Sequence, residues 1–539
     1  METFLSKHAN AVIGSLSGFD RVVFRGTLRM LAHRAGMAAY LWAARVLLKN
    51  FASHAEALTR QLREASEELA RQTSRPIRYL ASSASSKEDI AREIARVDGI
   101  TEGLICILTA VEPCLSYEIV RDRDSKRLEL LPRHRKCLHL YHYHIHPIFG
   151  FMHARIQTWF PFSIQICLNG REWLARSMNA AGIGYVQRDN CFTWLEAPKR
   201  AQILLNQQVQ AAWPELLNIV ARGLNPLHET MFQACPINYY WSTHQSEWAT
   251  DILFRDRRSL ARLYPRLIHH GLTTFFAPDV MRFLGRNIPS TGNIPPRLQG
   301  EVTTDMKTRP EGVRMKHRLK QNSIKMYDKQ GSVLRVETTI NDAADFKVYR
   351  TPEGKPEADK AWHRMRKGIA DLHRRAEVSQ AANDRYLQAL ASVEDTRSVG
   401  ELAAKLCQPA KLNGRRLRPL NPYAPDDAKL LNAISRGEFT INGFRNRDVR
   451  AQLFANAGVS KQEQRRQSAA VSRKLALLRA HRLIKKVPGT HRYHLTAQGR
   501  SIVTALITAR NTNSNTLIKL AACSLIPSFS LGHKRIGGS

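Results

Sequence analysis

The chain has 539 residues, 43% of them hydrophobic, which is enough for several domains with sizeable cores. Its 82 Lys and Arg outnumber its 46 Asp and Glu and give a formal net charge of +36. This excess favours polyanionic partners, and no run of apolar residues approaches the 18 needed to span a bilayer, so we expect a nucleic acid and no membrane.

The cysteines and the N-terminus indicate the compartment. The eight cysteines are scattered and include no Cys-x-x-Cys pair, which is typical of free thiols in a reducing compartment. The N-terminus, Met-Glu-Thr-Phe-Leu-Ser-Lys-His, does not have the features of a signal peptide. We therefore expect a cytoplasmic protein.

The first 196 residues alternate between strand and helix patterns. This alternation predicts an α/β N-terminal domain within a mixed α/β, multi-domain body. The predicted elements are an extended stretch over 10–28, two helical pieces over 29–72, a strand over 75–80, a helix over 87–97 and a buried strand over 103–111.

Composition divides the rest of the chain into five regions. Residues 197–300 are predicted to be a helical, aromatic-rich region, and residues 301–407 a basic region of β-hairpins followed by a long helix. Residues 408–426 are rich in Pro and Arg and are predicted to be a linker. A domain over residues 427–510 and a disordered tail over 511–539 complete the prediction.

The domain over residues 427–510 has the most definite pattern. Three helices are predicted, then a β-hairpin around Pro488-Gly489-Thr490, then a last helix. From Arg436 to Arg500 there are 15 Lys and Arg against 3 Asp and Glu, a net charge of +12, which is one third of the charge of the chain. This order of elements predicts a C-terminal winged helix-turn-helix domain.

Helical geometry separates two faces of the third helix. Val471, Leu475 and Leu478 fall on an apolar face. The opposite face is polar and suits the major groove of duplex DNA, while the hairpin suits its phosphate backbone. The predicted DNA-binding residues are Arg465, Arg466, Ser472 and Arg473 on the helix and Lys485, Lys486, His491 and Arg492 on the hairpin.

Residues 471–487 and 492–500 resemble the winged-helix domain of MarR-type DNA-binding regulators. The chain as a whole resembles bacterial proteins of uncharacterised function that are labelled MarR-like. The resemblance implies a role in transcription regulation. A winged helix can also serve as a protein-interaction module, which is the alternative.

Scattered acidic residues suggest a second class of function. Asp20 lies in an extended apolar stretch and Glu112 ends the apolar run over 103–111, with Glu337 or Asp305 as a further acid. RNase H-like nucleases hold two metal ions with carboxylates at such strand ends. The alternative is that these acids form salt bridges among the many arginines.

A histidine-rich strand offers a different site. His142, His144 and His146 share one face of a predicted strand and could ligate a divalent metal. The pattern resembles the metal-binding strand of rolling-circle replication endonucleases, which cleave single-stranded DNA with a tyrosine, and Tyr327 is the candidate. The alternative is a polar strand face directed to solvent or RNA.

Lys325 to Lys329, followed by Arg335-Val336-Glu337, resembles segments of plasmid and phage replication initiators. The alternative is a β-hairpin with cross-strand ion pairs.

Two functions from different classes remain. One is a regulator that binds duplex DNA, with RNA as a possible ligand, and that needs no cofactor. The other is a mobile-element nuclease, transposase or replication initiator that uses Mg²⁺ or Mn²⁺ and that is addressed to DNA by its winged helix.

Overall fold

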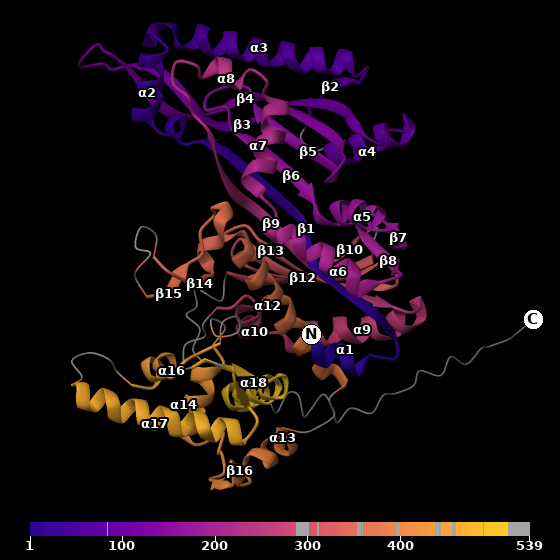
Figure 1. Cartoon of the computed structure of the whole chain (residues 1–539), viewed down its shortest axis with the longest axis vertical. Helices are drawn as coiled ribbons and strands as arrows, with labels where there is room; N and C mark the ends of the chain where they lie inside the picture. The colour runs from indigo at the N-terminus through magenta and orange to yellow at the C-terminus, as the bar shows by residue number, and fades with distance from the viewer. Residues whose placement is uncertain are drawn as a thin grey trace, which may run out of the picture. The chain divides into compact units, whose positions relative to one another are not determined.

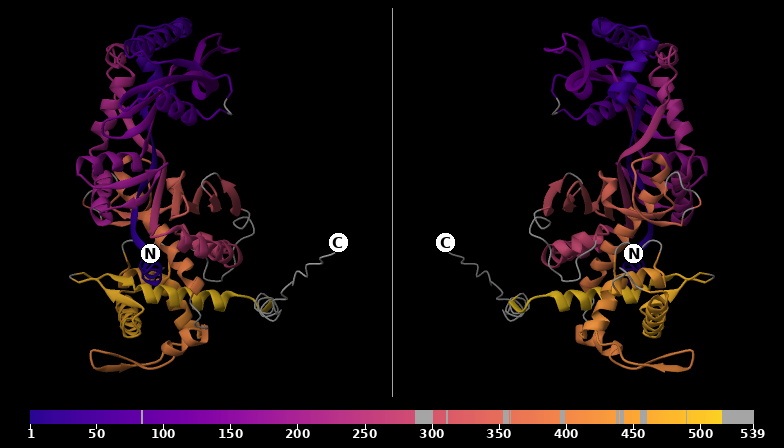
Figure 2. Two further views of the ribbon diagram at one scale, coloured as in Figure 1. Left: turned by 90° about the vertical axis from the view of Figure 1, so that its right-hand side faces the viewer. Right: turned by 90° about the vertical axis from the view of Figure 1, so that its left-hand side faces the viewer.

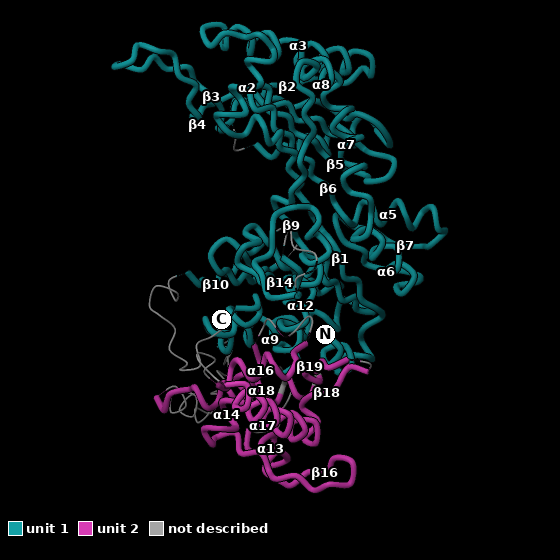
Figure 3. The backbone as a smooth tube through the Cα atoms, turned by 60° about the vertical axis from the view of Figure 1, so that its left-hand side comes forward, with its two compact units in different colours: residues 1–286, 296–393 teal, residues 287–295, 394–539 magenta. Residues whose placement is uncertain are grey.

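The computed structural model describes residues 1–82, 85–286, 301–309, 312–352, 357, 359–394, 399–436, 439, 443–454, 460–488 and 490–515. They form two compact units (Figure 3): unit 1 draws on residues 1–286 and 296–393, and unit 2 on residues 287–295 and 394–539. Helices and strands are both abundant, which confirms the mixed α/β class. No helix in these ranges has the length and apolar character needed to cross a bilayer.

An eleven-stranded sheet forms the centre of the described part of unit 1 (Figure 1). Neighbouring strands are antiparallel except for β2 and β3. The indigo β1 runs beside the magenta β9 along nearly its whole length (Figures 1 and 2). The strand order is β10 (Val302–Arg309), β11 (Gly312–Leu319), β12 (Asn322–Lys329), β13 (Val333–Ile340), β9 (Tyr239–Phe254), β1 (Val12–Leu28), β6 (Ile164–Asn169), β5 (Gly150–Gln157), β4 (Leu128–His146), β3 (Gly103–Arg121) and β2 (Ile77–Tyr79).

One face of this sheet, the helical face, carries the main core. Alternate residues of the strands, such as Phe24 and Ile166, are fully buried there. The amphipathic α3 contributes Leu58 and Leu62 at helical spacing. The helices that supply this core are α2 (Arg34–Ala43), α3 (Phe51–Gln72), α7 (Trp213–Leu224) and α12 (Leu372–Leu390).

The opposite face, the polar face, is covered at its two ends. Near β3 to β5 it packs against α4 (Lys87–Val97), which begins at the cap Ser86. Around β1 and β9 it packs against α5 (Gly170–Ala180), α6 (Pro198–Gln207) and the hairpin of β7 (Tyr185–Arg188) and β8 (Cys191–Leu195). Between these coverings the strands present charged side chains.

The remaining described elements of unit 1 lie outside the sheet and the helices named above. They are α1 (Glu2–Lys7), α8 (His228–Met231), α9 (Arg257–Thr274), α10 (Ala277–Phe283), the pair β14 (Lys347–Arg350) and β15 (Ala361–Arg364), and the 3-10 helices Met30–Ala32, Leu48–Asn50, Gln208–Gln210, Ala343–Asp345, Ile369–Asp371 and Ala391–Glu394.

Unit 2 contains helices and two small hairpins. Helix α17 buries Val471, Leu475 and Leu478 on one face, as predicted. Phe444 forms a bridge with Tyr493, so the second hairpin gains a third short extended segment. The elements are α13 (Val399–Leu406), β16 (Ala410–Leu412), β17 (Arg415–Leu417), α14 (Pro425–Ile434), α16 (Asn446–Leu453), α17 (Lys461–Ala480), β18 (Ile484–Lys486), β19 (Tyr493–Leu495) and α18 (Ala497–Asn511).

Several predicted elements differ from the structure. The prediction of a mostly helical region over residues 198–286 is wrong at β9, which is a central strand and is buried on both faces over 248–254. Residues 1–286 and 296–393 group into one unit, where we expected three regions. The predicted linker over 408–426 contains the β16–β17 hairpin. Most of the segment 437–443, the turn at 456–458 and residues 516–539 of the tail lie outside the described residues.

Candidate functional site

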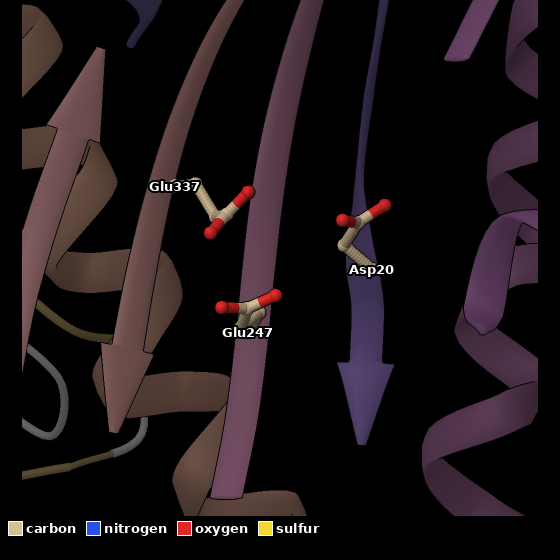
Figure 4. A group of neighbouring side chains, drawn as sticks. All are labelled: Asp20, Glu247 and Glu337. Carbon is tan, nitrogen blue, oxygen red and sulfur yellow. The ribbon is translucent and has the colours of Figure 1, made fainter. Parts of the chain in front are cut away.

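Three acidic side chains meet on the polar face of unit 1. Asp20 extends from β1, Glu247 from β9 and Glu337 from β13, which are adjacent strands (Figure 4). One oxygen from each carboxylate lies within 4.8 Å of the others. Of the described residues, these form the only group of three or more His, Cys, Asp or Glu side chains with the spacing of a metal site.

A β-bulge positions Asp20. On β1, Phe19 pairs with Trp248 and Arg21 pairs with Glu247, so Asp20 is an extra residue between consecutive partners on β9. Bulges redirect side chains and are common beside functional sites. Because of this bulge, Asp20 and Arg21 of β1 both lie next to Glu247 of β9 in the strand register.

Lys325 on β12 bridges two of the carboxylates. Its Nζ lies 3.1 Å from Oε1 of Glu247 and 2.6 Å from Oε1 of Glu337. The buried hydroxyl of Tyr327 donates a hydrogen bond to Oε2 of Glu337. Lys325 and Tyr327 are direct cross-strand partners of Glu337 and Arg335, so the hairpin has the predicted cross-strand contacts.

Arg335 joins the third carboxylate to a fourth. Its Nη1 donates to Oδ1 of Asp20 at 3.1 Å, and its Nη2 donates to Oδ2 of Asp251 at 2.8 Å. Arg171 of α5 also donates to Asp251 through Nε at 3.1 Å. Asn190, in the β7–β8 turn, donates to Asp20 at 2.9 Å and accepts from Arg335 through its backbone carbonyl. The whole network is buried or nearly so.

The direct ion pairs of this network join unequal numbers of acids and cations, and Arg21, the cross-strand partner of Glu247, adds a further positive charge at longer range. Four carboxylates face three cations: Asp20, Glu247, Asp251 and Glu337 against Arg171, Lys325 and Arg335. Burial, followed by the Glu337 charge, raises the pKa of Glu247. Burial is also the main cause of the raised pKa of Asp20, although Arg335 opposes it. Asp20 and Glu247 are therefore the two carboxylates whose ionised forms the network stabilises least.

The other two carboxylates have stronger partners. Burial alone would raise the pKa of Glu337, but the charge and hydrogen bond of Lys325 lower it overall. Burial likewise opposes ionisation of Asp251, and Arg335 and Arg171 overcome it, so the pKa of Asp251 is lowered.

The donor set fits a hard divalent cation. Carboxylate oxygens are the ligands that Mg²⁺ and Mn²⁺ prefer, and Asp20, Glu247 and Glu337 supply three such groups. The ammonium of Lys325 already lies between two of the carboxylates, so a cation would have to displace it. The residues could hold a metal ion or could form a purely structural ion network.

Two of the acids named from the sequence, Asp20 and Glu337, are brought together, whereas Glu112 is not. Glu112 lies on β3, four strands from β1 in the sheet, which corresponds to about 19 Å. It accepts hydrogen bonds from Tyr141 and Arg155 and pairs with Lys87 at 3.1 Å. Sequence reasoning placed it with Asp20 because it could not give the strand order.

Asp305 and Tyr327 are also placed by the structure. Asp305 lies on β10 and is 3.8 Å from Arg314. Tyr327 is buried and engaged with Glu337, so its hydroxyl is not presented as an accessible nucleophile.

The histidine strand does not form a metal group among the described residues. His142 and His144 share the predicted face, with ring centroids 6.5 Å apart. Nε2 of His142 contacts Ser66 at 3.2 Å, and Nδ1 of His146 accepts from the backbone of Ile148 at 3.1 Å. Burial lowers the pKa of His142 to about 3, so it is a neutral, buried histidine.

Glu247, Asp251 and Arg171 were not named from the sequence, and Lys325 and Arg335 were named only as parts of the basic hairpin. The period-2 spacing of Glu247, Ala249 and Asp251 would have shown the two acids on one face of a strand. It was missed because residues 198–286 were read as helical.

The predicted DNA-binding residues of unit 2 lie at its surface. On α17 all four are exposed, opposite the buried face. The hydroxyl of Ser472 accepts a hydrogen bond from Asn446 at 2.9 Å. On the hairpin, Lys485, Lys486 and His491 are exposed and Arg492 is half-buried. These side chains are positioned by β18 and β19, which pair Ile484 with Leu495.

No family model, curated protein or solved structure matches this chain.

Proposed function

We propose that this chain binds duplex DNA through unit 2, acting as a winged helix. The observation that carries the proposal is the two-sided α17, with Arg465, Arg466 and Arg473 exposed opposite the buried Val471 and Leu475. An α-helix of this kind fits the major groove, where arginine reads guanine. The β18–β19 hairpin adds basic side chains next to the helix in sequence, for contact with phosphates. The local net charge of +12 supports the same interpretation.

The first test measures duplex binding by the full chain. A variant with Arg465→Gln and Arg473→Gln is expected to bind a labelled mixed-sequence duplex at least tenfold more weakly, since each lost base contact costs about 1–3 kcal/mol. Its affinity should also depend less steeply on salt.

Arg60→Gln is the matched control, because Arg60 is exposed on α3 of unit 1. The control should bind like the parent chain. Equal duplex affinity of the double variant and the parent would rule out α17 as the DNA-binding element.

A second candidate function is metal-dependent cleavage of nucleic acid by unit 1. It is favoured by the convergence of Asp20, Glu247 and Glu337, which come from distant parts of the sequence. These three residues would hold the metal ion, which when bound would supply Lewis-acid catalysis and an activated water. Lys325, displaced from the carboxylates, would remain close enough to neutralise charge on a phosphate. The winged helix would then deliver the DNA.

The cleavage candidate is tested with plasmid DNA and labelled single strands in Mg²⁺ or Mn²⁺. Asp20→Asn and Glu247→Gln are each expected to abolish nicking, because each removes one of the three ligands. Asp305→Asn is the control, since Asp305 is a partly exposed acid on the distant edge strand β10.

Binding of the metal is measured separately. Mn²⁺ should raise the Tm of the parent chain but not that of Glu247→Gln, because a ligand that binds only the folded state stabilises it. A parent chain that neither cuts nor gains stability with metal would leave the acids with a structural role.

A further inference from the structure

A row of polar side chains crosses the polar face beside the acidic cluster. Arg25 on β1 is the cross-strand partner of Gln165 on β6, and Gln165 is the partner of Arg155 on β5. Cross-strand partners point to the same face, so the three side chains lie side by side. Two strand spacings separate the Cα atoms of Arg25 and Arg155 by about 10 Å.

Arg25 is a half-buried cation for which no described residue is a counter-ion. Its Nε is buried and has no hydrogen-bond partner, and no described residue gives its guanidinium an ion pair. Burial and then the charge of Arg155 lower the pKa of Arg25. Burying an unpaired charge is costly, so we expect Arg25 to lower the stability of the folded state.

The neighbours of Arg25 add positive charge. Arg155 binds Glu112 through Nη1 at 3.1 Å, but its own Nε is buried without a partner. His244 is exposed on β9, at a second bulge that lies between the partners of Val23 and Phe24, and Arg25 pairs with Ser242 two residues away. After burial, the charges of Arg25, Lys367 and Arg155 are the main causes that lower the pKa of His244. Among the described residues, the region therefore has donors and positive potential, and Glu112 is the anion that pairs with Arg155 but not with Arg25.

We propose that Arg25, Gln165 and Arg155 bind a phosphate group of a DNA strand, a site that rests on the proposed nucleic-acid-binding function. Guanidinium groups bind phosphate oxygens in a bidentate manner, and the Gln165 amide supplies a further N–H. Arg25 lies five residues from Asp20 along β1, or about 16 Å. The phosphate site and the acidic cluster thus lie along one strand, and a single bound DNA strand can reach both.

The decisive variant is Arg25→Gln in the full chain, because function and stability should change in opposite directions. Without DNA, removing the unpaired cation is expected to raise the Tm by about 2–4 °C. With a labelled 20-nucleotide single strand, the same variant is expected to bind about tenfold more weakly, with a salt slope smaller by about 0.7. Arg60→Gln, which removes an exposed charge from α3, should change neither quantity.

A second variant keeps the charge. Gln165→Ala should weaken single-strand binding while the Tm stays unchanged. The side chain of Gln165 has no hydrogen-bond partner to lose among the described residues, and alanine keeps the backbone pairing with β1 and β5. It keeps the proposal testable if Arg25→Gln does not fold. Parent-like binding by both variants, or by Gln165→Ala alone in that case, would overturn the proposal.

Two further arms separate the possible outcomes. Repeating the measurement in the Arg465→Gln, Arg473→Gln background isolates unit 1. If Arg25→Gln weakens single-strand binding in both backgrounds, the result supports the phosphate site, whether or not α17 binds duplex DNA. If only the α17 substitutions weaken binding, the phosphate site is wrong and the proposed function is still supported. If inorganic phosphate stabilises the parent but not Arg25→Gln, while single-strand binding is equal, the site takes free phosphate and the proposal is wrong.

Discussion

Replacing Arg335 with methionine is expected to prevent unit 1 from folding stably. The guanidinium is fully buried and donates to Asp20, Asp251 and the backbone carbonyl of Asn190. Its removal leaves the buried Asp20 without its ion-pair partner, next to the charges of Glu337 and Asp251, which already raise its pKa. Breaking a buried ion pair in this way costs about 3–5 kcal/mol, a large fraction of the roughly 5–15 kcal/mol that stabilises a typical domain.

Thermal unfolding of the full chain, together with limited proteolysis of residues 1–286, measures this effect. Arg318→Met is the matched control, because Arg318 is exposed on β11 of the same sheet. Arg335→Lys should also be destabilised, since an ammonium cannot reproduce the planar fork that reaches several acceptors. A stable Arg335→Met variant would show that the carboxylates do not need this cation.

Two similar substitutions in the acidic cluster should have opposite effects. At neutral pH, Glu337→Gln is expected to lose about 1.5–3 kcal/mol, because it replaces a carboxylate that accepts from Lys325 and Tyr327. Glu247→Gln is expected to gain about 0.5–2 kcal/mol, because burial and the charge of Glu337 disfavour the ionised form of Glu247. The free energies of unfolding of both variants, compared with the parent chain, test this difference.

The pH dependence follows from the directions of the pKa shifts. The pKa of Glu247 is raised from 4.5, so its contribution favours folding at pH below 4.5 and is lost as the pH rises through the folded-state pKa. The pKa of Glu337 is lowered from 4.5, so its contribution is present above pH 4.5 and is lost as the pH falls through the folded-state pKa. The gain from Glu247→Gln should therefore appear above pH 4.5, and the loss from Glu337→Gln should shrink in acid. Equal losses of unfolding free energy in both variants at neutral pH would contradict our interpretation that the network stabilises the ionised form of Glu337 but not that of Glu247.

The sequence predicts strands well where one face is polar or where turns punctuate the chain. The bounds predicted for α4 match the structure, and β1 is found to within a few residues. It fails at β9, because the second half of this strand, over 248–254, is buried on both faces and has no simple alternation of apolar and polar residues. That failure removed Glu247 from the candidate site.

The grouping of acids depended on information that local patterns do not contain. Asp20 and Glu337 were recognised as unusual acids on apolar strands, but Glu112 satisfied the same criterion. The difference lies in the order β1-β6-β5-β4-β3, which places Glu112 far from Asp20. Strand order is set by long-range pairing, which residue spacing does not reveal. The winged helix and its DNA-binding residues remain predictions.

The pairing of β1 with β9 has a consequence for synthesis of the chain. The first long strand ends at Leu28, but its partners begin only at Ile164 and Tyr239, and β13 follows at Val333. Closing such long loops carries an entropic cost before any contact compensates for it, which slows folding. During synthesis, the backbone N–H and C=O groups of β1 that pair with β9 have no partner until the more than two hundred residues between Leu28 and Tyr239 have been made. The nascent chain is therefore most exposed to aggregation before β9 is made, and its central sheet forms late.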